Sequence, residues 1–166
     1  MKHLKSLLFA TALFIGATSF MTAQSKIAHI DTQELIKAMP EYKAAEAEIE
    51  KLGKTYQAQM EDSYKEIEAK KKQYGAEAAT QTEETNIERM KEVQGMEQSL
   101  AQFQQNAQMD LQKKEIEKLK PITEKAKAAI EKVAAAQGFD YVLEKGGLIV
   151  AQGKDLMSDV KAELGI

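Results

Sequence analysis

Small and apolar residues recur at helical spacing along the first half of the chain. The recurring positions follow steps of 4, 3, 4, 4, 3, 4, 4, 3 and 4 residues and are Ala45, Ile49, Leu52, Tyr56, Met60, Ser63, Ile67, Lys71, Tyr74 and Ala78. This eleven-residue repeat corresponds to about 3.67 residues per turn and favours a straight or slightly right-handed coil. Ser63 and Lys71 interrupt the stripe. The pattern therefore predicts a long helix with a weakly specified helical partner.

A second long helix is expected after a turn between residues 75 and 82. Thr80-Gln81-Thr82-Glu83 has the spacing of a capping box, which marks a helix start. Pro40 and Pro121 lie equally far from this turn, so an antiparallel hairpin places them together at its base, with arms of about 60 Å. The apolar positions expected on the second helix are Ile87, Met90, Val93, Met96, Leu100, Phe103, Ala107, Leu111, Ile116, Leu119 and Ile122.

Short segments before the hairpin predict a strand and a short helix. Residues 26–31 alternate apolar and polar side chains, which is typical of a strand. Asp31 and Glu34 have capping-box spacing, which predicts a helix start. Pro40 interrupts that helix and is well placed to begin the next one.

The segment after Pro121 predicts the rest of a small body. Pro121 need not end the second helix, because strong helix formers lie on both sides of it, and Gly138 is the expected C-terminal cap. Residues 139–143 and 148–151 are predicted to form a β-hairpin around a turn at 145–147. Asp155 is expected to cap a final helix. The fold class is therefore mainly α, with a small β-sheet body and a long antiparallel helical hairpin.

The chain divides into four expected parts. Residues 1–23 resemble a secretory signal, with a basic start, an apolar run from Leu7 to Ala17 and small residues near Ala23. A membrane anchor is the alternative, but the apolar run is shorter than the roughly 20 residues that span a bilayer. Cleavage is expected after Ala23, with Ser19 as the alternative. Residues 24–40 begin the body, 41–120 form the hairpin arm and 121–166 complete the body.

Composition excludes several kinds of chemistry. The chain has no Cys and two His, of which His3 lies in the expected signal, so neither a metal site nor a Ser-His-Asp triad is expected. The net charge of -3 argues against nucleic-acid binding. Gly147 to Lys154 lacks phosphate-loop spacing, and a turn and loop are expected there. We therefore expect no enzyme activity and no cofactor.

Two surface features of the expected arm are unusual. Four of the eight Met residues lie on it, and flexible thioethers suit varied apolar partners, although a coiled-coil core is the alternative. Seven Gln lie between Gln94 and Gln112, and Asp110 is the only charge from Gln98 to Gln112. Such a surface could lie near apolar segments, or it could be an ordinary solvated face. The basic run Lys70-Lys71-Lys72 is either a solvated face or a peripheral contact with an anionic membrane surface.

The order of these elements resembles the Skp/OmpH family of periplasmic chaperones. The matching segments are residues 26–31, 39–43, 120–122 and 138–143. The resemblance implies a soluble periplasmic homotrimer whose three arms hold unfolded outer-membrane β-barrel proteins without ATP. The best-known members are strongly basic, whereas this chain is acidic, so apolar contact is expected to outweigh charge attraction.

Candidate functional residues follow from this interpretation. Residues expected at the oligomer interface are those that one short helix would cover poorly, namely Ile27, Ile30, Val142, Leu148 and Val150. Residues expected to contact clients on the arm are Met60, Ile67, Met90, Met96 and Phe103. The competing hypothesis is a structural coiled-coil spacer or adaptor of the cell envelope, which would have a sharper apolar seam.

Overall fold

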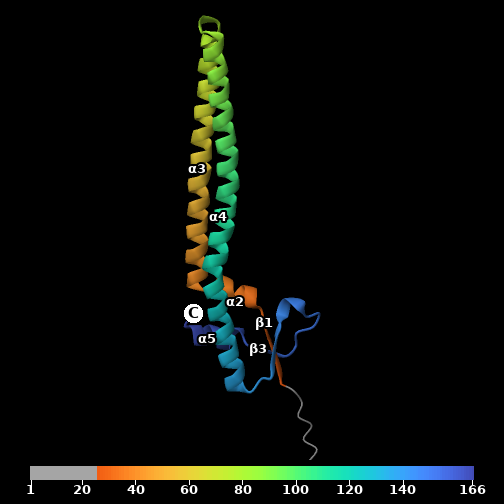
Figure 1. The fold of residues 1–166 in the computed structure, drawn as a ribbon. Coiled ribbons are helices and arrows are strands. Elements are labelled where there is room, and N and C mark those ends of the chain that lie inside the picture. Colours follow the sequence, from red (N-terminus) through yellow and green to blue (C-terminus); the bar gives the residue numbers. More distant parts are fainter. Residues whose placement is uncertain (1–25) are drawn as a thin grey trace, which may run out of the picture.

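The computed structural model describes residues 26–166, and the predicted signal at residues 1–23 lies outside this range. Two long helices, α3 (Pro40–Glu77) and α4 (Glu83–Gln137), lie side by side and form an arm that rises from a small body (Figure 1). The body contains short strands, the short helix α2 (Thr32–Ala38) and the C-terminal helix α5 (Met157–Leu164). This architecture confirms the predicted fold class of a helical hairpin on a small sheet-containing body.

The start of the arm follows the local signals in the sequence. The Asp31 carboxylate accepts the Glu34 N–H at 2.8 Å and caps α2 as predicted. Met39 has extended backbone geometry, as the residue before a proline prefers. Pro40 then occupies the first turn of α3, where its missing N–H is tolerated.

The turn between the arm helices is capped differently from the prediction. A 3₁₀ turn, η1 (Ala78–Thr80), follows α3, and the Thr82 side chain accepts the Thr85 N–H at 3.2 Å to cap α4. The capping box predicted at Thr80 and Glu83 is therefore wrong by two residues. The Thr80 hydroxyl instead donates to the Glu77 carbonyl at 2.8 Å, because it still belongs to the end of the preceding helical run.

α4 runs through Pro121 without interruption, so Pro121 does not end the helix. The helix ends at Gly138, which has a left-handed φ of 69°. Its N–H donates to the Ala135 carbonyl at 3.2 Å, and the Phe139 N–H donates to the Ala134 carbonyl at 2.9 Å. Residues with a Cβ rarely adopt this conformation, which explains glycine here.

Replacing Pro121 with Ala is expected to stabilise the protein. The exposed Pro121 lies inside α4, so Ala would restore a helical N–H and remove the ring's clash with the preceding turn. The gain in unfolding free energy should reach up to about 3 kcal/mol. Thermal denaturation followed by circular dichroism measures it, with Lys120→Ala as the neighbouring control. An unchanged or lower midpoint in Pro121→Ala alone would show that the body requires the proline.

The sheet has three strands in the order β2-β1-β3, and its topology corrects the prediction. β1 (Ile27–Ile30) is central and pairs in parallel with β2 (Tyr141–Glu144) on one side and β3 (Lys154–Asp155) on the other. The predicted antiparallel hairpin is wrong: residues 145–147 form a 3₁₀ turn, and residues 148–151 form no strand.

Burial near the C-terminus explains this topology. The Leu156 N–H donates to the His29 carbonyl at 3.0 Å, and both Leu156 and Val160 are fully buried. The chain must therefore cross β1 to place these two side chains under the sheet. Burying two aliphatic side chains stabilises the fold by roughly 3–6 kcal/mol, which outweighs the local tendency of Gly146-Gly147 to form a tight hairpin.

The hydrophobic core belongs to the body alone. α2, the beginning of α3, the final third of α4, β1 and α5 contribute its buried residues. They are Ala28, Ile30, Leu35, Met39, Ala45, Ile122, Ala126, Ala129, Val133, Ala134, Leu156 and Val160. The arm between residues 46 and 121 therefore extends beyond this core.

Candidate functional site

The arm helices meet along a narrow interface, here called the seam. The seam includes Tyr56 and Phe103, whose rings pack edge to face with centroids 5.8 Å apart. The Tyr56 hydroxyl donates to the Asp110 carboxylate at 2.7 Å, and this hydrogen bond raises the pKa of Tyr56. Only Ile67 and Ala107 are buried in this middle part of the arm. The seam is thus half-apolar, as the interrupted stripe predicted.

Polar contacts between the helices fix their register at the base of the arm. Lys118 pairs with Glu48, and Lys125 pairs with Glu41. Hydrogen bonds from these lysines hold the pKa of each glutamate below its usual value. Further along the arm, Lys71 and Glu97 lie 2.7 Å apart. Exposed ion pairs of this kind add little stability singly, but they favour one alignment of the two helices.

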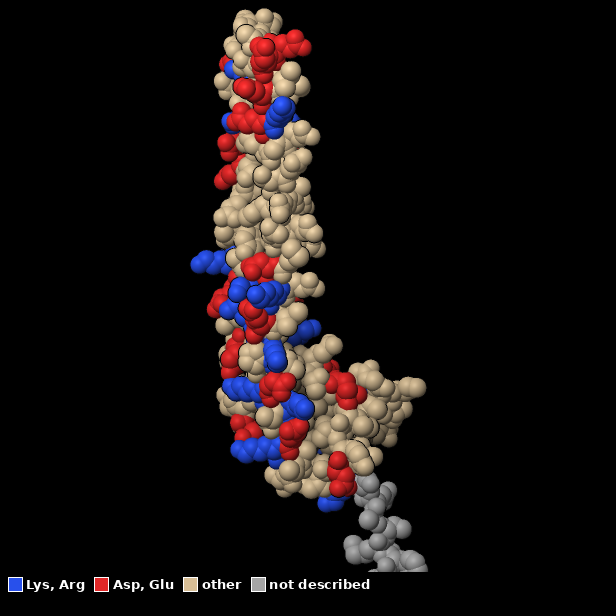
Figure 2. Space-filling view, in the orientation of Figure 1, with Lys and Arg blue, Asp and Glu red and all other residues tan. Residues whose placement is uncertain are grey.

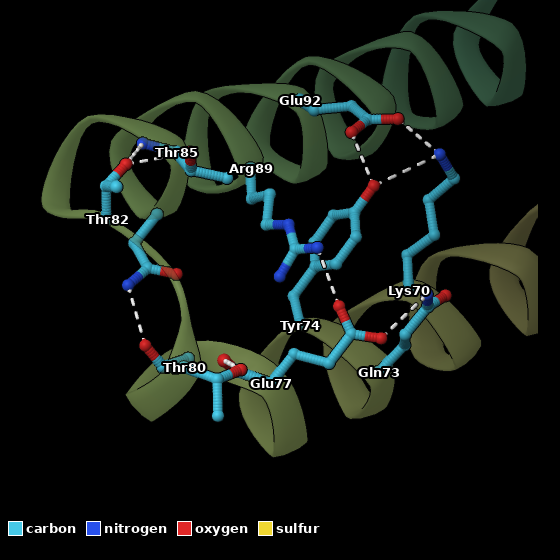
Figure 3. A network of polar contacts seen from close by, with 11 residues as sticks. Lys70, Gln73, Tyr74, Glu77, Thr80, Thr82, Thr85, Arg89 and Glu92 are labelled. Carbon is cyan, nitrogen blue, oxygen red and sulfur yellow. Dashed lines mark hydrogen bonds and ion pairs between the residues drawn. The ribbon is translucent and has the colours of Figure 1, made fainter.

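A polar network closes the tip of the arm (Figure 3). Arg89 is the only arginine in the chain; it lies 4.5 Å above the Tyr74 ring and 2.6 Å from the Glu77 carboxylate. The Tyr74 hydroxyl donates to Glu92 at 2.6 Å, and Lys70 pairs with the same carboxylate. The hydrogen bond from Lys70 is the main cause of the lowered pKa of Glu92. Most of these groups satisfy one another, but the buried Nη1 of Arg89 has no hydrogen-bond partner within residues 26–166. The contacts join α3 to α4, so the network holds the two helices together at the tip.

The positions predicted to contact clients differ in their exposure. Met90 is 66% exposed, whereas Ile67 is buried in the seam and is not accessible to a partner. Met60, Met96 and Phe103 are half-buried at the seam. The structure therefore brings four of the five predicted side chains to the seam and leaves one exposed.

Four other large apolar side chains of the arm are exposed, and two of them were expected on the apolar stripe. Ile87 and Ile116 were predicted on the apolar stripe, but they are 40% and 62% exposed. Tyr64 and Met109 are 58% and 53% exposed. Near the tip the phase of α4 explains the difference: Arg89 is half-buried there and its neighbour Met90 is not, so Ile87 and Met90 lie on the outer side.

The body also exposes apolar side chains. Of the residues predicted at an oligomer interface, Ile27 and Val150 are 50% and 68% exposed, and Val142 and Leu148 are half-buried. Ile30 is 1% exposed and belongs to the chain's own core. Ile149, in the segment predicted as the returning strand, is fully exposed. A groove of about 600 Å³ lies beside β2, lined in part by Ile36, Ala126, Ile130, Phe139 and Val142.

His29 of β1 is a buried polar residue. It is 5% exposed, and neither ring nitrogen has a hydrogen-bond partner. The Asp155 carboxylate lies 3.8 Å from its Nδ1 atom. The Asp155 carboxylate also accepts the Met157 N–H at 2.9 Å at the start of α5. This environment belongs to the packing of the sheet against α5.

Two further observations describe residues 26–166. No three His, Cys, Asp or Glu side chains in this range gather in a way that could hold a metal ion. No helix within it combines the length and the apolar character needed to cross a membrane. The exposed apolar side chains of the arm and of the body make up the candidate site.

Comparisons with known proteins agree with this architecture. A sequence model of the family described as "Outer membrane protein (OmpH-like)" matches residues 26–164. The protein named Chaperone protein Skp from Photorhabdus laumondii is 25% identical over 162 residues, which cover 95% of this chain and 97% of that protein. The protein of the same name from Pectobacterium atrosepticum is 20% identical, with 89% and 90% covered.

A solved structure has the same fold. The crystal structure of an OmpH-like outer membrane chaperone candidate from Caulobacter crescentus CB15 superposes with a TM-score of 0.78. The match covers 87% of both chains at 16% identity. At this identity the likeness concerns the fold alone.

Proposed function

Because the chain belongs to the OmpH-like outer membrane protein family, we propose that it is an ATP-independent holdase chaperone of the periplasm. Its clients are unfolded outer-membrane β-barrel proteins, which it keeps from aggregating. The observation that carries this proposal is the arm, a hairpin outside the hydrophobic core that exposes large apolar side chains along its length. They are Tyr64, Ile87, Met90, Met109 and Ile116.

These side chains suit the holding of unfolded chains. They are separated by polar residues, so each offers a small apolar contact. Met90 also lines an open groove of about 410 Å³ near the tip. Apolar contact is non-directional and scales with the area removed from water. Many weak contacts of this kind would retain an unfolded client of almost any sequence, and a folded barrel would offer fewer of them.

The proposal includes a homotrimer formed by the body. Strands of four, four and two residues are short for a stable sheet. β2 and β3 are edge strands, and Ile149 and Val150 lie exposed between them in the sequence. Association of identical chains would cover these edges and side chains. Three bodies joined in this way would place three arms around a common space.

Export to the periplasm is also part of the proposal. The basic start and apolar run of residues 1–23 support it. Protein isolated from cells should therefore begin near Gln24 when its N-terminus is sequenced. An intact Met1 in the membrane fraction would contradict export and cleavage.

A spacer function remains the second candidate, because the ion pairs at the base and the polar network at the tip stiffen the arm. Light scattering of an outer-membrane protein diluted from urea, with and without residues 24–166, separates the two functions. A holdase suppresses aggregation without ATP, and salt between roughly 0.05 and 0.5 M should weaken it only modestly, because apolar contacts are not screened. Equal aggregation with and without the protein would favour the spacer.

A further inference from the structure

The outer face of α4 carries no charge over five turns. Its side chains point away from the seam and are all exposed. We call this surface the uncharged α4 face; it consists of Gln94, Gly95, Gln98, Ala101, Gln102, Gln105, Gln108, Met109 and Gln112. Figure 2 shows the corresponding middle of the arm as a band without charged side chains, between a charged tip and a charged base.

Two carboxylates beside this face are directed to the other helix. Asp110 is the only charged residue between Gln98 and Gln112, and its half-buried carboxylate accepts the Tyr56 hydroxyl at 2.7 Å. Glu97, next to Gln98 in the sequence, lies 2.7 Å from Lys71 of α3. The outward surface is consequently neutral because of its composition and because these two carboxylates face the other helix.

The opposite helix is different at the same height. Contacts of Tyr56 with Asp110 and of Lys71 with Glu97 show that residues 56–71 of α3 lie beside residues 97–110 of α4. This part of α3 exposes six charged residues: Glu61, Asp62, Lys65, Glu66, Glu68 and Lys71. Charge keeps exposed helix faces soluble. A general need for solubility therefore does not explain why the outer face of α4 lacks charged residues at this height and α3 does not.

The dimensions and chemistry of the face fit an extended strand. Residues 94–112 span about 27 Å of helix at 1.5 Å per residue. The apolar band of a transmembrane β-barrel is about 25 Å tall, and its strands have about 10 residues. Glutamine amides both donate and accept hydrogen bonds, as the unpaired backbone of an unfolded strand requires. Met109 adds a flexible apolar contact.

We propose that the uncharged α4 face binds one extended transmembrane strand of an unfolded client. The amides bond to the backbone of the strand, and its apolar side chains lie against Ala101 and Met109. Because neither partner has to dehydrate a charge, binding is favoured over contact with the charged side of the arm. This inference rests on the proposed holdase function and specifies which surface performs it.

Matched charge substitutions test the proposal in the full-length mature chain. Gln98→Lys with Gln108→Lys places two charges on the uncharged α4 face. Gln59→Lys with Ala69→Lys places two charges at similar heights on exposed positions of α3. A third variant, Gln98→Glu with Gln108→Glu, has the opposite charge. The probe is a tryptophan-containing outer-membrane β-barrel protein diluted from urea, whose fluorescence is read without interference because this chain has no Trp.

Both α4 variants should bind the probe about tenfold more weakly than the wild type, and the α3 variant less than about twofold more weakly. Helical content should stay constant in all three, since every position is exposed. If the α3 and α4 pairs weaken probe binding equally, or if neither weakens it, the proposal is overturned. Binding of the probe by the wild type would still support the holdase function. If the Lys pair and the Glu pair change the affinity for the probe in opposite directions, the proposal is also overturned, because binding at the face would then depend on the sign of the charge.

Two other occupants of the face are tested by the same samples. If a second copy of the chain occupies the face, the mass of the wild type should rise with concentration. The α4 variants should then have a lower mass and unchanged probe binding. An anionic lipid surface would let the wild type bind phosphatidylglycerol vesicles and the Lys variant bind them more tightly, again with unchanged probe binding. Either result overturns the proposal. Failure of the wild type to bind the probe removes the holdase function and this inference together.

Discussion

Ile149→Asp combined with Val150→Asp should convert the proposed homotrimer into single chains. Both side chains are exposed in one chain, so the carboxylates do not disturb its core. In an assembly that covers residues 148–151, two unpaired charges would be buried at a cost of several kcal/mol. Light scattering after size-exclusion chromatography should show the mass falling from about three chains to one, with helical content retained.

The control for this variant is Gln152→Asp, which adds a charge at an exposed polar position next to the segment. Its mass should equal that of the wild type. Ile30→Asp is a poor test, because Ile30 is buried within its own chain and a charge there should unfold the body. An unchanged mass in the double variant would show that residues 148–151 lie outside the oligomer interface.

Removal of the arm should abolish the holding of clients and spare the body. Replacing Leu52 to Leu111 with a short Gly-Ser loop deletes the exposed apolar side chains Tyr64, Ile87, Met90 and Met109. The core of the body contains no residue between Ala45 and Ile122, so its packing should survive. The armless protein should form an assembly with the same number of chains as the wild type. Outer-membrane protein diluted from urea should aggregate in its presence as it does in buffer.

A single substitution provides the contrast. Met96→Ala removes one half-buried thioether and should change protection only slightly, because a client is held by many weak contacts. If the armless body protected as well as the full chain, the client surface would lie on the body. If Met96→Ala alone abolished protection, the contacts would be few and specific.

Most signals that act within one or two turns predicted the fold correctly, although the capping box at Thr80 was wrong by two residues. Asp31 and Gly138 cap helices by contacts with adjacent residues, and Pro40 fixes its own backbone angle, so each could be predicted without knowledge of distant residues. The apolar stripe of α3 also fits, from Ala45 to Ile67. Beyond Ile67 the seam passes through Lys70 and not Lys71, because the tip network uses Lys70 to reach Glu92.

The sheet could not be predicted because its pairing depends on distant contacts. Residues 139–151 have the alternation and glycines of a hairpin, but β1 occupies the position between β2 and β3. β3 pairs with the far side of β1 because the chain has to bury Leu156 next to it. No pattern of neighbouring residues in the sequence indicates this burial. Competition of this kind between local turns and tertiary burial is common in strands.

Exposure was the least predictable property of the candidate site. A change of one position in helical phase separates a seam residue from a surface residue, as Arg89 and Met90 illustrate. The neutrality of residues 98–109 was visible in the sequence, but its confinement to the outer side of α4 required the contact between Tyr56 and Asp110.

The most direct test of the chaperone function is a binding titration read from the client's own tryptophan. Because this chain contains no Trp, changes in emission report only on the client. Titration of the mature chain into an unfolded outer-membrane protein, without nucleotide, should give a saturable blue shift, and the same protein folded in detergent micelles should give none. An unchanged spectrum for the unfolded client, or equal binding of the folded one, would contradict the proposed function.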